Sequence, residues 1–355
     1  MFAVEAFTDS DRPSAGALRP AADDDIFTVA SPEGPTDMSF LDEDYLLETP
    51  AARDLYDRIA EKPIVDPHTH ADVVTETLDA DVHTLVEKPL AATVEDADRM
   101  VAAAEESDAV AMVAYMKRYD PAYERAQGLI DDFDVDLVTA YDVDPDHGRI
   151  IDEVYDIVDG TLPEGFLGES IAERRDQLRR AIDATDEFLV DAYDFQLDHV
   201  CHDVNALRGL FGRVERIRDV DVFADGRYAT ATLEYEGGVR CVLETGDSDR
   251  KWFEQYIRAD APDGALTIDF SNPFIRNTPT ELRVKQGTET LEETTHTPSY
   301  DESFKRELEH FVRCARDDAT VRTSFAEARE DLRVIVNLFR AYQGKPLVEP
   351  ATASG

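Results

Sequence analysis

Residues that could do chemistry gather at two places in this sequence. At the first, residues 82–89 read VHTLVEKP, so a short apolar run ends in a carboxylate, an ammonium and a proline: Glu87, Lys88 and Pro89. Buried strands of parallel sheets present functional side chains at this end. The sequence therefore predicts that the EKP residues lie at the edge of a parallel sheet.

The second place is residues 195–212, FQLDHVCHDVNALRGLFG, where apolar residues at helical spacing predict one helix that stops at Gly212. Asp198, His202 and Asn205 share the face opposite the apolar stripe. A carboxylate one turn before a histidine can orient the imidazole and raise its pKa, as a general acid or base requires. The alternative is an ordinary solvated face. His199, a quarter-turn away, is interpreted as incidental.

The surrounding pattern supplies elements to position these groups. Residues 93–107 predict a helix capped by Thr93, and residues 109–115 predict a second buried strand, which makes a βαβ unit. Residues 135–143 alternate like the first strand of another domain. Two hairpins follow, with turns at residues 236–238 and 262–264.

At these residues the chain resembles the glucose-fructose oxidoreductase and inositol dehydrogenase family (Gfo/Idh/MocA), from about residue 76 to 347. Glu87, Lys88 and Pro89 match its EKP motif, and residues 198–205 resemble its D-x-x-x-H-x-x-D pattern. The resemblance implies that Lys88 touches cofactor and substrate hydroxyl. It also implies that Asp198 and His202 complete the catalytic set.

Residues 116–123, MKRYDPAY, resemble the N-x-R-F/Y-x-P segment that leads into that family's substrate domain, although Met116 replaces the asparagine. By resemblance, NAD or NADP is the cofactor. The implied cofactor-binding residues are Glu87, Lys88, Pro89 and Arg118. For Arg118, a plain surface cation is the alternative.

A different resemblance covers residues 38–72, which look like the N-terminus of uronate isomerase, a metal-dependent (β/α)₈ barrel. His68 and His70 match that family's metal-binding H-x-H pair. Because the resemblance ends after about 35 residues whereas a barrel needs roughly 250, we assign no metal ligands. We place the join between the two resemblances at residues 72–78.

No glycine occurs between Gly34 and Gly128. A dinucleotide site needs a glycine-rich turn so that the backbone can approach the pyrophosphate. We therefore expect a truncated nucleotide domain that binds NAD(P) weakly or not at all.

The predicted fold class is α/β plus α+β: a truncated Rossmann-like parallel sheet, then a substrate domain with an open antiparallel or mixed sheet packed on helices. The expected parts are an acidic tail (1–37), the isomerase-like segment (38–75), the Rossmann-like part (76–120), the substrate and oligomerisation domain (121–347) and a tail (348–355).

Composition limits the partners. The chain has 78 acidic and 36 basic residues, a formal charge of −42, which opposes binding to nucleic acid or anionic membranes. The acid-rich, lysine-poor pattern is typical of proteins that work in concentrated salt. Three dispersed cysteines predict buried, reduced thiols. We expect a cytoplasmic protein, since no apolar run approaches a membrane span.

The predicted function is an NAD(P)-dependent oxidoreductase of a sugar or polyol, with a sugar acid as a mild preference. The missing glycine turn puts its activity in doubt. The alternatives are a uronate isomerase, or a non-catalytic remnant that forms homo-oligomers through its antiparallel sheet.

Overall fold

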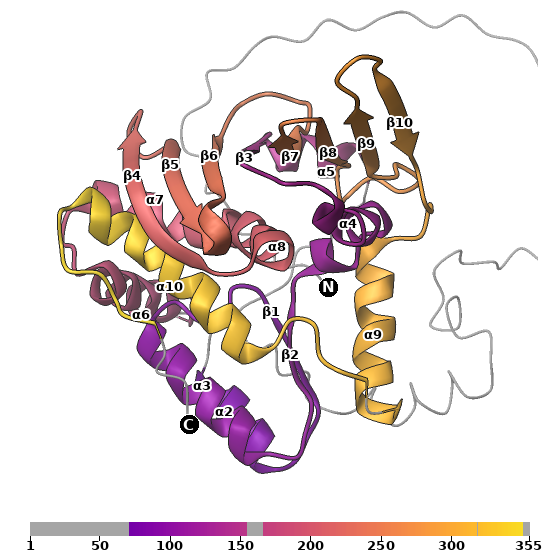
Figure 1. Ribbon diagram of the computed structural model, residues 1–355. Coiled ribbons are helices and arrows are strands. Elements are labelled where there is room, and N and C mark those ends of the chain that lie inside the picture. The colour runs from indigo at the N-terminus through magenta and orange to yellow at the C-terminus, as the bar shows by residue number, and fades with distance from the viewer. Residues whose placement is uncertain (1–70, 155–165, 318, 351–355) are drawn as a thin grey trace, which may run out of the picture. The chain divides into compact units, whose positions relative to one another are not determined.

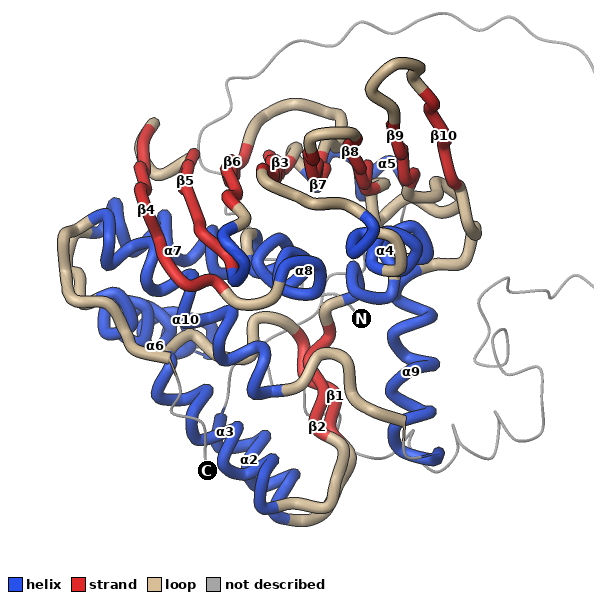
Figure 2. Tube along the Cα trace, viewed as in Figure 1, coloured by secondary structure: helices blue, strands red, loops and turns tan. Residues whose placement is uncertain are grey.

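The computed structural model describes residues 71–154, 166–317 and 319–350, all within one compact unit of the chain, Asp66–Gly355. The isomerase-like segment and its His68 and His70 therefore lie outside the described residues, except for residues 71–75. Figure 2 shows the strands in two separate sheets, a small one and a large one.

The small sheet confirms the predicted βαβ unit. Strand β1 (Thr84–Glu87) pairs in parallel with β2 (Ala111–Ala114), and α3 (Val94–Glu106) connects them. Thr93 caps α3, because its side chain accepts the backbone N–H of Asp96. Helix α2 (Ala71–Asp79) packs against α3, and the predicted join at residues 72–78 falls inside α2.

The large sheet has eight strands in the order β10-β9-β8-β7-β3-β6-β5-β4. Strand β3 (Leu137–Asp144) is near its middle, parallel to β6 (Arg240–Asp247) and antiparallel to β7 (Gln255–Ala261). Both predicted hairpins are present. Their remaining strands are β5 (Tyr228–Tyr235) and β8 (Gly264–Phe270). The strands that complete the sheet are β4 (Val214–Phe223), β9 (Glu281–Gln286) and β10 (Glu292–His296).

Helices line one side of this sheet in Figure 1: α7 (Glu187–His199), α8 (Cys201–Phe211) and α10 (Phe325–Tyr342). Helix α10 also contacts α3, so it links the two sheets. The other elements are η1 (Met116–Tyr119), α4 (Pro121–Gln127), η2 (Ile130–Asp132), α5 (His147–Val154), α6 (Phe166–Ile182), η3 (Glu236–Gly238) and α9 (Ser303–Asp317). The predicted fold class is thereby confirmed.

Two further expectations have outcomes here. All three cysteines are free and buried, as predicted. The single helix expected at residues 195–212 is wrong, because α7 ends at His199 and α8 begins at Cys201. Among the described residues, no helix is long and apolar enough to cross a membrane.

Candidate active site

Lys88 leaves β1 and reaches the break between α7 and α8. Its Nζ donates to the backbone oxygen of Asp198 at 2.9 Å and lies 3.8 Å from that residue's Oδ1. The Sγ of Cys201 donates to the same backbone oxygen at 3.3 Å. Burial works to lower the pKa of Lys88, but neighbouring groups that favour its charged form, Cys201 and then Asp198, outweigh burial and raise the pKa. Lys88 is therefore a positively charged donor at neutral pH.

His202 lies on the first turn of α8, beside Lys88. The residue is half-buried, its Nδ1 is enclosed and has no hydrogen-bond partner, and its ring meets the edge of Tyr115 at 6.3 Å. Burial, followed by the positive charges of Lys88 and Lys117, holds the pKa of His202 well below its usual value. A neutral imidazole can accept a proton, so this environment suits a general base.

Asp198 does not orient His202 as the sequence suggested. Within the part of the chain that the structure describes, no hydrogen bond joins the two side chains. The Asp198 carboxylate instead lies near Lys88 and 3.7 Å from the Nη2 of Arg174. Its position between two cations suits it to hold Lys88 in place.

Asn205 departs from the expectation that Asp198, His202 and Asn205 form a face opposite the core. It is 1% exposed, and its Nδ2 donates to Asp331 Oδ2 at 2.7 Å. The break at Val200 and the packing of α8 against α10 bring this side into the interior.

Three of the predicted cofactor-binding residues are consecutive, at the end of β1 and directly after it, and the fourth, Arg118, lies in η1. Glu87 is exposed at the end of β1, and Pro89 is buried behind a cis peptide bond. Arg118 is buried and turns toward α8, where its Nη1 donates to the backbone oxygen of Asn205 at 3.3 Å. The cofactor contacts of these residues stay predictions.

His199, interpreted from the sequence as incidental, is a central residue of the site. Its side chain is buried between two aspartates of β3: its Nδ1 is 3.1 Å from Asp144 Oδ2, and its Nε2 is 3.7 Å from Asp142 Oδ1. Burial opposes the charged form, but Asp142 and then Asp144 outweigh it and raise the pKa of His199 to about 10. His147 Nε2 meets the other oxygen of Asp144 at 2.9 Å.

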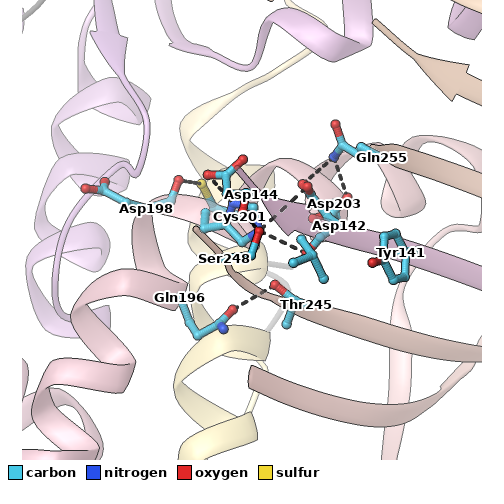
Figure 3. Close-up of polar contacts among 12 residues, drawn as sticks. Tyr141, Asp142, Asp144, Gln196, Asp198, Cys201, Asp203, Thr245, Ser248 and Gln255 are labelled. Carbon is cyan, nitrogen blue, oxygen red and sulfur yellow. Dashed lines mark hydrogen bonds and ion pairs between the residues drawn. The ribbon is translucent and has the colours of Figure 1, made fainter. Parts of the chain in front are cut away.

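A second group missed by the sequence reading connects β3, β7 and α8 (Figure 3). Gln255 Nε2 donates to Asp142 Oδ2 at 2.5 Å and to Asp203 Oδ1 at 2.7 Å. Its Oε1 accepts from the buried Lys117. The available signal was the pair of aspartates two apart at the end of a strand, which places both side chains on one face.

The enclosed polar atoms around this site that have no hydrogen-bond partner include Asp142 Oδ1, Gln196 Nε2, His202 Nδ1 and Asp203 Oδ2. Buried polar atoms are nearly always paired, so unpaired ones point to groups that a ligand or water satisfies. Their mixture of donors and acceptors suits a ligand that carries hydroxyl groups.

The described residues do not fit the pyrophosphate of a dinucleotide. The turn from β1 into α3 has no glycine, and the Thr93 side chain already accepts one N–H of the first turn of α3, that of Asp96. No glycine lies anywhere between residues 71 and 127. We therefore derive no step of chemistry through NAD(P).

Comparisons with known proteins found similarity to an oxidoreductase family and to sugar dehydrogenases. Residues 58–115 match the GFO_IDH_MocA model, described as an oxidoreductase family with an NAD-binding Rossmann fold. D-xylose 1-dehydrogenase (NADP(+)) 2 of Haloferax volcanii is 24% identical over 290 residues, which cover 79% of this chain and 77% of that protein.

A D-xylose 1-dehydrogenase [NADP(+)] of Haloarcula marismortui is 42% identical, over 83 residues that cover 23% of this chain and 22% of that protein. Among solved structures, aldose-aldose oxidoreductase from Caulobacter crescentus has a TM-score of 0.57 at 19% identity. The match covers 83% of this chain and 82% of that one. This likeness supports the fold.

Proposed function

We propose that this chain, which the family model and relatives support as a Gfo/Idh/MocA oxidoreductase, acts on a sugar or polyol hydroxyl group at Lys88 and His202. The observation that carries the proposal is the pairing of a charged Lys88 with a neutral His202 whose Nδ1 has no partner. The relatives named as xylose dehydrogenases favour an aldose as the substrate.

The two side chains have separate tasks. The neutral imidazole of His202 accepts the proton of the reacting hydroxyl, since burial and nearby cations favour its unprotonated form. Lys88 donates a hydrogen bond to the same oxygen and stabilises the negative charge that develops there. Asp198 keeps Lys88 at this position through its backbone oxygen and carboxylate.

Substrate hydroxyl groups away from the reacting carbon have partners too. Asp203 Oδ2 accepts a hydrogen bond, and Gln196 Nε2 donates one. A sugar acid would add attraction to Lys88 and Arg174. D-Xylose, myo-inositol and D-glucuronate together separate an aldose, a polyol and a sugar acid.

The chain binds NAD(P) weakly. A pyrophosphate brings two negative charges, and the described residues offer no glycine turn to receive them. The net charge of −42 adds repulsion. The remaining contacts, at Lys88 and Arg118, offset only part of the free-energy cost of association.

Oxidation of the three substrates at high coenzyme concentration tests the proton-transfer role. Lys88→Met and His202→Asn should each lower turnover by about 100-fold or more, as expected for a lost donor to the developing charge and for a lost general base, respectively. The exposed Lys305→Met is the matched control and should keep the wild-type rate. Equal rates for wild type and His202→Asn would exclude the proposed base.

Fluorescence titration with NADH and NADPH in concentrated KCl tests the cofactor claim separately. The expected dissociation constant is well above the micromolar range. Micromolar binding that disappears in Lys88→Ala would contradict the claim, and would mean that residues outside the described ones supply the phosphate contacts.

A further inference from the structure

We propose that Asp142, Asp144 and His199 bind one divalent first-row metal ion, with Mn²⁺ and Zn²⁺ as the fitting candidates. The three residues come from the end of β3 and the last turn of α7. One ligand atom from each lies within 4.8 Å of the other two. The site needs neither NAD(P) nor the proton transfer proposed above.

The spacing suits a shared ion. Ligand atoms about 2.1 Å from one metal lie about 3 Å apart when their bonds are at right angles, and about 4.2 Å apart when opposite. His199 Nδ1 and Asp144 Oδ2 are 3.1 Å apart. The pair can therefore contact one ion with little movement, and rotation of the Asp142 carboxylate can supply the third ligand.

The other ring nitrogen of His199 is already held as a metal ligand's would be. Its Nε2 donates to the backbone oxygen of Asp142 at 3.1 Å. A histidine that binds a metal usually gives its second N–H to a carbonyl or carboxylate, which fixes the ring and leaves the first nitrogen for the ion. Here that arrangement directs Nδ1 at Asp144.

A second observation independent of the spacing is an unpartnered ligand atom. Asp142 is 2% exposed, and its Oδ1 has no hydrogen bond although it faces His199. Its other oxygen is satisfied by Gln255, and the free oxygen is the one nearer to His199, 3.7 Å from Nε2 of that ring. An enclosed carboxylate oxygen without a donor is costly unless a cation meets it.

The charges around the cluster favour a cation. Asp203 brings a third enclosed carboxylate through Gln255, and it too has an unpartnered oxygen. Lys117 lies 3.7 Å from Asp142 and supplies one positive charge. An ion on Nδ1 displaces a proton from His199 and leaves the ring neutral, and a divalent ion then balances the two negative charges left by the three carboxylates and Lys117.

The chemical types of the three ligands determine which metal ions fit the site. Two carboxylates and one imidazole suit Mn²⁺ or Zn²⁺, whereas Cu⁺ prefers sulfur. The nearby Cys201 thiol points to the backbone oxygen of Asp198. Asp144 has a side chain 23% exposed, so an ion can enter from solvent.

The test uses the full chain in concentrated KCl, which limits weak binding of ions to the acidic surface. After dialysis against Mn²⁺ or Zn²⁺ and then metal-free buffer, elemental analysis should find about one ion per chain. In Asp144→Asn and in His199→Gln, the amount of ion retained per chain should fall by tenfold or more. Asp146→Asn, a neighbouring carboxylate paired with Arg149, and His310→Gln, a buried histidine on α9, are the controls that should keep it.

A spectroscopic measurement on the wild type tests the site even if the variants fail to fold. Pulsed electron paramagnetic resonance of the Mn²⁺ form should show coupling to one imidazole nitrogen. The proposal fails if no ion is retained, if the ion survives in both ligand variants, or if bound Mn²⁺ shows no nitrogen coupling. The last result would mean that only surface carboxylates hold the ion.

Discussion

Glu307 on α9 should make this protein less stable as pH rises. It is 3% exposed, and one of its carboxylate oxygens has no partner. Burial, followed by repulsion from Glu87, raises the pKa of Glu307 from 4.5 to about 9. Between these values the unfolded chain releases the proton while the folded chain keeps it. Proton release therefore favours unfolding, and the free energy of unfolding falls by up to about 1.4 kcal/mol for each pH unit.

Glu307→Gln keeps the shape of the side chain and removes the titration. Relative to wild type, the variant should gain free energy of unfolding as pH rises, by up to about 2.7 kcal/mol between about pH 5.5 and about pH 7.5. Urea unfolding of both proteins at both pH values, in the same KCl concentration, measures this double difference. All other titrating groups cancel in it.

The exposed Glu309 on the same helix provides a matched control. Glu309→Gln should give the same difference from wild type at both pH values, because that carboxylate is exposed in a pair with Lys305. If Glu307→Gln behaves in the same way, Glu307 is ionised in the folded protein. The argument from its burial would then be wrong.

Three other predictions concern stability. The melting temperature followed by circular dichroism should rise with KCl concentration because the charge of −42 repels itself, and an unchanged value would contradict this. Gly209→Ala should destabilise by more than about 1 kcal/mol in urea unfolding, although alanine usually favours helices, since its Cβ would collide with Tyr123 and Arg118. A neutral or stabilising result would show that these side chains can move aside. Asp331→Ala should cost about 3–5 kcal/mol in the same assay because it leaves the buried Arg208 unpaired, and a loss below about 1 kcal/mol would mean that water reaches Arg208.

Local patterns were sufficient for much of the fold. Thr93 predicted a helix start, because capping depends on residues three apart in sequence. The hairpins followed from glycine turns between alternating strands. The end of a helix at His199 was missed, because the apolar spacing continues across Val200. That spacing carries no information about Lys88, which is far away in sequence and binds the backbone oxygen of Asp198.

The candidate site was only partly predictable for the same reason. The motif resemblance singled out Lys88 and His202, and the structure places the charge of Lys88 close enough to lower the pKa of His202. His199 was misjudged because its partners, Asp142 and Asp144, lie more than 50 residues earlier and meet it only when β3 packs against α7. Lys117 escaped notice because a lysine beside Arg118 resembles a surface residue until its burial is known.

Lys88 is anchored chiefly to a main-chain oxygen, and this has a consequence for sequence variation. Every residue type at position 198 offers the same carbonyl, so a substitution there removes the flanking carboxylate without removing the 2.9 Å hydrogen bond. The position of the ammonium group is thus encoded by the path of the backbone between α7 and α8. A different side chain at position 198 would therefore change the pKa of Lys88 without changing the position of its ammonium group.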